Sequence, residues 1–192
     1  MTHTDGKTVD RAAIWNTRYQ NKSAAAGQLS DELQEKLDQL PIGRTLDLAC
    51  GDGAAALQLA AAGHQVVAVD FAKEGLKRLQ VFAAEEGRVI DTHQLDLSVT
   101  GSLSALGCFD NIVILRYLPD LSLLQQLPAL IEPSGRLFIS TFNLEHHRQT
   151  GFSQRFCLKP RMLCDSFPQL KLVEYENGAE EGRPLDNYLF QK

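Results

Sequence analysis

The chain has 192 residues, of which 44% are apolar and 22% are charged. These fractions are those of a globular protein and exclude a wholly disordered chain. With 19 basic and 24 acidic side chains, the formal net charge is −5, which disfavours non-specific binding to nucleic acid or to an anionic membrane. No stretch approaches the roughly 20 apolar residues that cross a bilayer. We therefore expect neither nucleic acid nor a membrane as a partner.

Four cysteines, Cys50, Cys108, Cys157 and Cys164, lie in unrelated contexts without CxxC spacing. This pattern predicts neither a disulfide framework nor a zinc site, and we expect no bound metal. The first ten residues are polar and lack the apolar core of a secretion signal. The sequence thus predicts a cytoplasmic protein with reduced thiols.

Residues 1–9 are predicted to be a disordered tail, followed by one domain over residues 10–192. Two helices come first, over residues 10–19 and from Ser30 to just before Pro41. Strands and helices then alternate, which is typical of a parallel sheet covered on both faces. The predicted strands span residues 44–50, 64–70, 89–95, 109–115 and 136–141, the helices between them span 54–63, 73–86 and 121–131, and two closing strands span 170–176 and 187–192.

The sharpest feature of the sequence is the segment Leu46–Gly53, in which a buried strand closes on glycines and a helix begins. Gly51 and Gly53 let the backbone turn tightly and approach a ligand closely, because glycine has no Cβ. Such a turn lies at the carboxyl end of the sheet, where ligands bind in open α/β folds. The segment Gly51–Ala56 also fits the loose dinucleotide pattern G-x-G-x-x-A, so the glycines alone do not select a ligand.

Three carboxylates accompany three successive predicted strands. Asp47 lies in the first strand, where its burial is costly unless it serves a partner such as an ammonium group. Asp70 ends the second strand, where a carboxylate can accept hydrogen bonds from both hydroxyls of a ribose. Asp96 closes the third strand, where it can accept from an adenine amino group. Each alone also fits a strand-end cap, but together they indicate a site for an adenosine with a short zwitterionic arm.

These segments resemble a known family. Leu46–Gly53 resembles the first motif of the class I S-adenosylmethionine-dependent methyltransferases, and Val66–Ala72 resembles the second. Asp96–Leu97 and Phe109–Leu115 fall where later motifs of that family fall. The resemblance covers roughly residues 10–192. It implies an α/β, single-domain Rossmann-like methyltransferase fold: a seven-stranded, mostly parallel sheet in the order 3-2-1-4-5-7-6, with strand 7 antiparallel and helices on both faces.

The resemblance also implies S-adenosyl-L-methionine as the cofactor. Its methionine part would lie among Asp47, Gly51 and Gly53, with Ala49 standing where the family usually has its first glycine. Its adenosine would meet Asp70 at the ribose, Phe71 at the face of the adenine, and Asp96 at the amino group, with Leu97 supplying backbone contacts. The implied cofactor contacts are Asp47, Ala49, Gly51, Gly53, Asp70, Phe71, Asp96, Leu97 and Leu115.

A narrower resemblance rests on Trp15–Tyr19, Leu115–Leu118 and Ser140–Asn143, which are similar to small bacterial methyltransferases of the tellurite-resistance and thiopurine types. In that group the N-terminal helix folds over the cofactor, which implies a lid within residues 10–40. Trp15, Arg18 and Tyr19 share one helical face, which fits a lid and equally fits ordinary packing. The tellurite type tends to place a His-Arg pair in the final hairpin. Here Glu180–Arg183 has no histidine, which disfavours tellurite as the acceptor.

Candidates for acceptor contact and catalysis follow the fourth and fifth predicted strands. Arg116 and Tyr117 follow the fourth strand, and Arg116 would bind an anionic acceptor or pair with Asp120. Asn143, His146, His147 and Arg148 follow the fifth strand, and His146 and His147 would each be a base, an acceptor contact or a solvated loop residue. A thiol acceptor needs mainly alignment, whereas an amine or a hydroxyl also needs a general base. The sequence singles out no one base.

Residues 144–170 form an insertion rich in apolar side chains, such as Phe152, Phe156 and Met162. This insertion is too short to grip a protein or an RNA, and we expect it to close over a small molecule on the substrate side. The predicted function is methyl transfer to a small-molecule acceptor by in-line displacement. Two alternatives stay open: a non-catalytic S-adenosylmethionine-binding sensor or partner subunit, and a nicotinamide-dependent oxidoreductase, which Asp47 and the closing strands disfavour.

Overall fold

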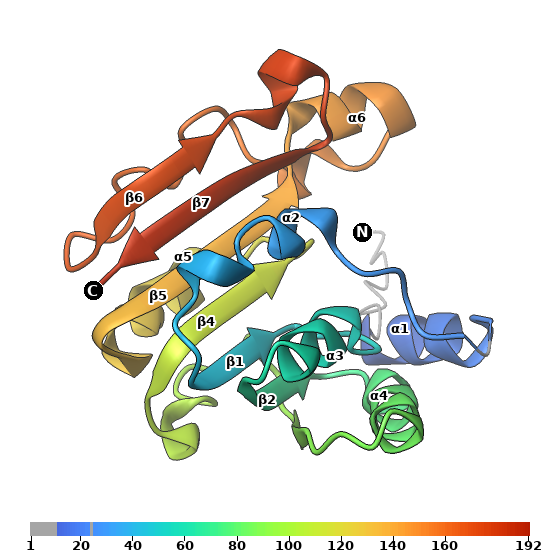
Figure 1. Cartoon of the computed structure of the whole chain (residues 1–192). Coiled ribbons are helices and arrows are strands. Elements are labelled where there is room, and N and C mark those ends of the chain that lie inside the picture. The colour runs from blue at the N-terminus through green and yellow to red at the C-terminus, as the bar shows by residue number, and fades with distance from the viewer. Residues whose placement is uncertain (1–10, 24) are drawn as a thin grey trace, which may run out of the picture.

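The computed structural model describes residues 11–23 and 25–192, and the predicted tail over residues 1–9 lies outside them. Seven strands form one sheet in the order β3-β2-β1-β4-β5-β7-β6 (Figure 1). The strands are β1 (Arg44–Leu48), β2 (Gln65–Asp70), β3 (Asp91–Gln94), β4 (Phe109–Leu115), β5 (Ile131–Phe142), β6 (Lys171–Glu176) and β7 (Leu185–Gln191). Strands β1 to β5 run parallel, and β7 runs antiparallel to both β5 and β6. The predicted strand order and the antiparallel strand 7 are confirmed.

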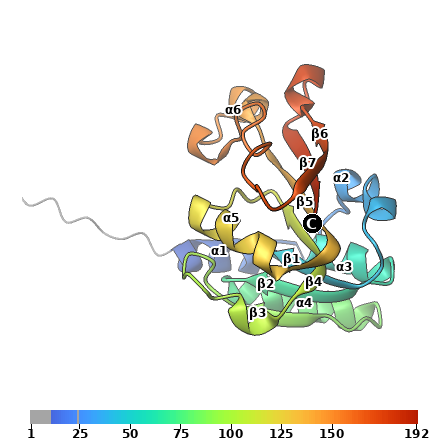
Figure 2. The ribbon, with the colours of Figure 1, turned by 90° about the vertical axis from the view of Figure 1, so that its left-hand side faces the viewer.

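Helices lie on both faces of this sheet, as predicted (Figures 1 and 2). They are α1 (Arg11–Gln20), α2 (Asp31–Gln34), α3 (Ala54–Ala61), α4 (Lys73–Glu85), α5 (Leu121–Gln126) and α6 (Leu144–Thr150), with short 3-10 helices at Leu37–Gln39, Ser104–Leu106, Leu127–Leu130, Gln154–Phe156 and Gly178–Glu181. One apolar core joins α3 and α4 to the sheet, and a second core joins α5 to the opposite face. Strands buried on both faces explain the nearly continuous apolar runs of β2 and β4. Among the described residues, no helix combines the length and apolarity needed to span a membrane.

Several element boundaries differ from those predicted. The second helix ends at Gln34 instead of continuing to Pro41. The third strand begins only at Asp91, because Arg88 N bonds back to Ala83 O as the chain turns out of α4, and this leaves Val89 93% exposed. The fifth helix gives way to a 3-10 turn that contains Pro128, a residue without a backbone N–H to donate.

A buried lysine ties the region after α2 to the closing strands. The Nζ of Lys36, whose side chain is only 6% exposed, contacts Glu174 at 2.8 Å and Glu176 at 2.6 Å. Although burial raises the pKa of Glu176, hydrogen bonds from Lys36 and Asn187 lower it overall. This ion cluster fixes the N-terminal segment against β6.

We expect Lys36→Met to lower the free energy of unfolding by about 1–3 kcal/mol, because it leaves two neighbouring carboxylates without their cation. Urea unfolding at pH 7 measures the loss. The penalty should shrink as the pH falls through the lowered pKa of Glu176, because protonation of this carboxyl removes its attraction to Lys36. Lys77→Met removes an exposed pair with Glu74 and should cost about 0.5 kcal/mol or less. Equal losses in the two variants would contradict a structural role for Lys36.

Candidate functional site

The loop between β1 and α3, residues 49–53, is called the glycine loop below. Its backbone enters the left-handed region three times, at Ala49 (φ 62°), Gly51 (φ 60°) and Gly53 (φ 87°). This region favours glycine, because a Cβ there crowds the backbone. The conformation of Ala49 therefore explains why the resembled family usually has glycine at this position.

Asp47 lies on β1, an interior strand of the sheet, in register between Ala68 of β2 and Val113 of β4. Its side chain is buried, and its Oδ2 atom has no hydrogen-bond partner among the described residues. Burial, followed by the nearby charge of Asp70, raises the pKa of Asp47 to about 7, although the Ala56 N–H lowers it. A buried carboxylate oxygen without a partner is costly, and a cationic ligand would satisfy it.

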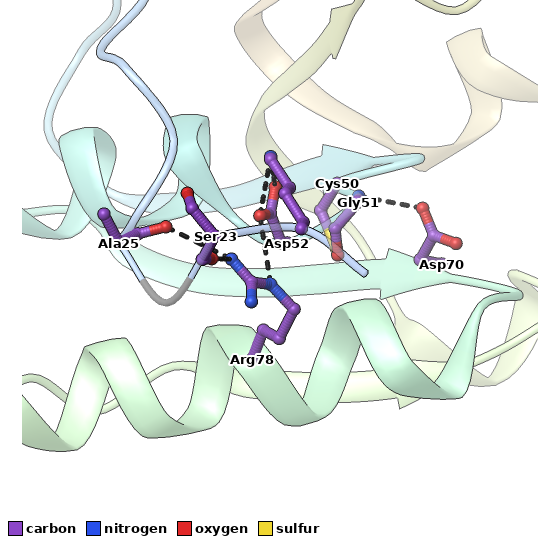
Figure 3. A network of polar contacts seen from close by, with 8 residues as sticks. Ser23, Ala25, Cys50, Gly51, Asp52, Asp70 and Arg78 are labelled. Atoms are coloured by element: carbon purple, nitrogen blue, oxygen red, sulfur yellow. Dashed lines mark hydrogen bonds and ion pairs between the residues drawn. The ribbon is translucent and has the colours of Figure 1, made fainter. Parts of the chain in front are cut away.

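Asp70 ends β2 and reaches the glycine loop. Its Oδ2 accepts a hydrogen bond from Gly51 N at 2.8 Å (Figure 3), and its Oδ1 accepts one from Ala72 N at 2.8 Å. Burial raises the pKa of Asp70 even though these N–H groups lower it. A carboxylate offers about four lone-pair directions, so Asp70 can hold the loop and still accept further hydrogen bonds.

The other predicted adenosine contacts lie near the ends of β2 to β4. Asp96 does not close β3, which ends two residues earlier; it is exposed and accepts hydrogen bonds from the backbone and hydroxyl of Ser98. These bonds lower the pKa of Asp96. Phe71 is half-buried, with the guanidinium of Arg11 5.8 Å from its ring centre. The side chains of Leu97 and Leu115 pack against the two cores.

Helix α1 lies beside α4 at this edge of the sheet (Figure 1). Two side chains of α1 contact the elements beneath it. The Oδ1 of Asn16 accepts a hydrogen bond from Glu74 N of α4 at 3.0 Å, and Tyr19 reaches the glycine loop. A Cβ at Gly51 would lie 2.5 Å from the Tyr19 hydroxyl oxygen, so this ring packs directly on the glycine loop. Burial, then the charges of Asp70 and Asp52, raise the pKa of Tyr19 strongly.

The other two residues of the predicted lid face are placed differently. Trp15 is 37% exposed, and the Arg18 guanidinium lies 4.7 Å from its ring centre. Of the three lid candidates, the structure therefore brings only Tyr19 against the glycine loop. Helical spacing groups these residues on one face but does not reveal which of them turns inward.

Three charged residues of the site went unpredicted. Asp52, in the middle of the glycine loop, contacts Lys22 at 2.7 Å and Arg78 of α4 at 3.3 Å. Arg78 also binds the backbone near residue 23 (Figure 3). The glycine motif contains Asp52, but nothing in the sequence pattern identifies its two cationic partners.

The predicted acceptor residues lie on the neighbouring strand ends. Arg116 has a φ of 54° and pairs with Glu32 at 3.4 Å, not with Asp120, which instead caps α5 by accepting Leu123 N. Tyr117 is half-buried, and burial raises its pKa. The ring of His146 on α6 stacks on Phe142 with 4.1 Å between ring centres.

A cavity of about 350 Å³ lies beside α6, within the region predicted as a substrate-side insertion. His147 and Arg148 line it together with Asp186. Asp186 is buried and accepts hydrogen bonds from Asn143 at 2.7 Å and from Gly178 N at 3.1 Å. Of the candidates after the fifth strand, Asn143, His147 and Arg148 line this cavity and His146 does not.

Comparison with known proteins identifies the family. A family described as "Methyltransferase domain" matches residues 45–135, which include β1, the glycine loop and Asp70. Residues 45–135 thus form a methyltransferase domain, and this match supports a class I S-adenosylmethionine-dependent methyltransferase. The cofactor of this family is S-adenosylmethionine.

Curated proteins similar to this chain are named as methyltransferases. The ubiquinone biosynthesis O-methyltransferase of Xanthomonas campestris pv. campestris is 34% identical over 110 residues, which are 54% of this chain and 45% of that protein. The chain thus spans less than half the length of this curated relative.

Solved structures share the fold. TehB from Haemophilus influenzae superposes with a TM-score of 0.71 and 16% identity, over 87% of this chain and 63% of that one. Magnesium protoporphyrin IX methyltransferase from Synechocystis PCC 6803, solved with bound SAM, gives a TM-score of 0.67 and 17% identity, over 97% and 99% of the two chains. At these identities the likeness shows the fold alone.

The residues of the site fit the cofactor of the family. S-adenosylmethionine carries an ammonium group, a sulfonium and a ribose. The orphaned oxygen of Asp47 suits the ammonium group, and Asp70 retains acceptor capacity for ribose hydroxyls. Tyr19 and the glycine loop form the adjoining wall.

Proposed function

We propose that this chain transfers a methyl group from S-adenosylmethionine to a small-molecule acceptor. The observation that carries the proposal is the buried Oδ2 atom of Asp47, which has no hydrogen-bond partner among the described residues. Asp47 lies near the carboxyl end of β1, and Asp70, at the end of β2, is close enough for its charge to raise the pKa of Asp47. Asp47, which has an unpartnered oxygen, and Asp70, which accepts only backbone hydrogen bonds, place two acidic side chains beside the glycine loop. These charges favour a cationic nucleoside over the pyrophosphate of a dinucleotide, which they would repel. This charge pattern disfavours the nicotinamide alternative.

The proposed contacts divide the cofactor between two groups of residues. Asp47, Ala49, Gly51 and Gly53 would hold its methionine part, and Asp70, Phe71, Asp96, Leu97 and Leu115 would hold its adenosine. When bound, the cofactor supplies a methyl group already activated by the sulfonium. The chain's own residues then have to align the acceptor and exclude water, a contribution worth about 7–11 kcal/mol in well-oriented reactions.

A small molecule is the proposed acceptor. The insertion over residues 144–170 lies after β5 and, together with Asn177, Ala179 and Asp186, lines a cavity of about 350 Å³, a size that suits a small molecule. Relatives are named for ubiquinone biosynthesis and for magnesium protoporphyrin IX, which agrees with this class of acceptor. Arg116, Tyr117 and His146 stay the candidates for acceptor contact. A cytoplasmic location is part of the proposal, supported by four cysteines that form no disulfide.

Methyl-labelled S-adenosylmethionine, incubated with the purified protein and a panel of thiols, phenols, amines and carboxylic acids, tests the proposal. We expect label transfer to at least one small acceptor. Cofactor binding without transfer to any acceptor would favour the non-catalytic sensor instead. Transfer only to protein or nucleic acid would contradict the proposed acceptor class.

Calorimetry checks the ligand class. We expect S-adenosylhomocysteine to bind and NAD not to bind. Asp70→Ala should weaken S-adenosylhomocysteine by more than about 1 kcal/mol, since ribose hydrogen bonds to a carboxylate are charge-assisted. Asp91→Ala, which removes an exposed carboxylate on β3, serves as the control. Equal affinities of the two variants for S-adenosylhomocysteine would show that Asp70 does not contact the ligand.

A further inference from the structure

The cavity beside α6 is lined by a buried acid, Asp186, whose side chain is almost fully enclosed at 1% exposure. Its carboxylate accepts hydrogen bonds from Asn143 Nδ2 at 2.7 Å, from Gly178 N at 3.1 Å and from the Tyr175 hydroxyl at 3.2 Å, and all three donors are neutral. Among the described residues, no lysine, arginine or histidine forms an ion pair with Asp186. Burial raises the pKa of this carboxyl, although the hydrogen bonds lower it. A buried negative charge of this kind is costly unless a cation compensates it.

His147 supplies the cavity with an acceptor nitrogen. Its Nδ1 lies 2.6 Å from the carbonyl oxygen of Phe152. Because a carbonyl oxygen can only accept, Nδ1 carries the proton and donates it, and Nε2 of the neutral ring is then an acceptor. His147 is half-buried and lines the cavity. Its Nε2 is therefore available to a ligand that donates a hydrogen bond.

Asn177 adds a second acceptor to the same cavity. Its Nδ2 donates to the carboxylate of Glu180 at 2.7 Å, and since a carboxylate only accepts, this contact fixes the orientation of the amide. The Oδ1 of Asn177 is buried and has no hydrogen-bond partner among the described residues. A buried amide oxygen left in this way is costly unless a ligand or a water donates to it.

The remaining lining does not compensate these acceptors. Of the described residues that line the cavity, Arg148 is the one arginine or lysine. Its side chain is 64% exposed and pairs with Glu145, one turn earlier in α6, so its charge is already balanced. Leu144, Leu158 and Pro160 form an apolar part of the wall. The cavity thus suits a ligand with a positive, hydrogen-donating group and a short apolar body.

We propose that this cavity binds an organic amine as its ammonium ion. The charge of Asp186 attracts the ammonium group, and Asn177 Oδ1 and His147 Nε2 accept its N–H bonds. The same atoms would repel a carboxylate or a phosphate. The inference rests on the proposed function only for the fate of the amine, which we assign as the methyl acceptor. The binding itself needs no cofactor.

The cavity lies at the edge of the sheet that carries the glycine loop. Strands β1, β4 and β5 are parallel neighbours in the sheet, so their carboxyl ends meet at one edge. Asn143 of the cavity directly follows β5, and the glycine loop follows β1. Figures 1 and 2 both show α6 and α1 on this side of the sheet. An acceptor held in the cavity therefore approaches the same edge as the proposed cofactor.

An amine acceptor gives His147 a chemical role. An ammonium nitrogen has no lone pair, so it has to lose a proton before it can attack a methyl group. His147 Nε2 takes this proton, which leaves a neutral amine and an imidazolium that is stabilised by its Nδ1–H bond to Phe152 O. His147 is then the catalytic residue, and His146, which does not line the cavity, is not.

Three probes with one apolar body test the binding in the unliganded protein at pH 8: benzylamine, benzyl alcohol and benzoate. We expect benzylamine to shift the backbone amide resonances of Gly178 and Ala179 in a nitrogen-15 NMR titration. It should bind about tenfold more tightly than benzyl alcohol, because hydrogen bonds from a charged donor are the stronger ones. Benzoate should not bind. Equal affinities for benzylamine and benzyl alcohol, or no shifts at these amides with benzylamine, would overturn the proposal.

Two substitutions should change benzylamine affinity in opposite directions. Asp186→Asn should weaken it about tenfold, and Asn177→Asp, which adds a charge at the free oxygen, should tighten it about threefold to tenfold. Glu181→Gln removes a 67% exposed carboxylate nearby and is the matched control, with less than about a twofold change. If Asp186→Asn does not fold, because four groups donate to this carboxylate, Asn177→Asp decides. Unchanged or weaker affinity in folded Asn177→Asp would overturn the proposal.

Failure of this inference and failure of the proposed function are distinguishable. Benzylamine binding is measured without cofactor, so it stands even if S-adenosylhomocysteine does not bind. Methyl label transferred to phenols or thiols, in a protein that does not bind benzylamine, would overturn the amine site and leave the proposed function intact. Label transferred to amines should fall at least about a hundredfold in His147→Gln, while benzylamine affinity changes less than about threefold. Equal transfer in wild type and His147→Gln would overturn the catalytic role of His147.

Discussion

Asp47→Asn is expected to weaken S-adenosylhomocysteine binding by about 2 kcal/mol or more, which is about thirtyfold. The side chain of Asp47 is buried, and its Oδ2 is the one buried carboxylate oxygen among the described residues that has no hydrogen-bond partner. Asparagine keeps the shape and can still accept from Ala56 N, but it removes the charge that would face the ammonium group. Calorimetry at pH 8 measures the loss. Unchanged affinity would exclude Asp47 from the site.

The same substitution should stabilise the unliganded protein at pH 8. Burial raises the pKa of Asp47 from 3.8 to about 7, so between these values the unfolded chain ionises first and the folded protein loses stability as the pH rises. The loss is complete above about pH 7 and amounts to no more than about 4 kcal/mol. Asp47→Asn removes this pH-dependent loss of stability. The free energy of unfolding of the variant should therefore exceed that of wild type by more at pH 8 than at pH 5. Asp91→Asn, an exposed control, should show neither effect.

Cofactor binding should also release protons. Near pH 7 the raised pKa leaves Asp47 about half protonated, and pairing with an ammonium group requires the ionised form. We expect a net release of protons on binding at pH 7, up to about one per ligand, measured by calorimetry in buffers of different ionisation enthalpy. The release should disappear in Asp47→Asn.

Gly75→Ala is expected to have the second large effect. Gly75 lies in the first turn of α4, where an added Cβ would be 2.6 Å from the carbonyl oxygen of Gly51 and 3.1 Å from a ring carbon of Tyr19. The loop cannot simply retreat, because Asp70 holds Gly51 N. We expect the free energy of unfolding to fall by about 1–3 kcal/mol and ligand affinity to fall about tenfold, although alanine is the better helix former.

Gly63→Ala is the matched control for this glycine. Gly63 has a φ of 97° and no heavy atom within 4 Å of an added Cβ, so alanine there costs about 1–2 kcal/mol of backbone strain and leaves the site untouched. Urea unfolding and calorimetry compare the two variants. A Gly75→Ala protein that is more stable than wild type and binds normally would contradict the close packing of α4 on the glycine loop.

Most of the fold could be predicted, because alternating strands and helices leave few topologies and the family motifs select one of them. Asp47 and Asp70 were also predictable, since each sits at a fixed place relative to the glycines at the end of a buried strand. The position of Asp96 was predicted only in part: it follows the third strand, as expected, but that strand ends two residues earlier, at Gln94, and Asp96 is exposed. Strand ends are set by pairing with the neighbouring strand, which no local pattern records.

Ion-pair partners could not be predicted, because pairing depends on which charged side chains lie close together in the folded protein and not on their separation in the sequence. Arg116 pairs with Glu32, 84 residues earlier, although Asp120 is only four residues away. Lys22 meets Asp52 across 30 residues. Long charged side chains have many nearby candidates in sequence, and only the packing of α1 and α2 against the sheet decides which one is reached.

A crystal structure with S-adenosylhomocysteine tests the central claim most directly. The account predicts the ligand at the glycine loop, with its ammonium group at Asp47 and its ribose hydroxyls at Asp70, under Tyr19 of α1. Electron density for the ligand at any other edge of the sheet, or none at the glycine loop in a crystal soaked to saturation, would contradict it.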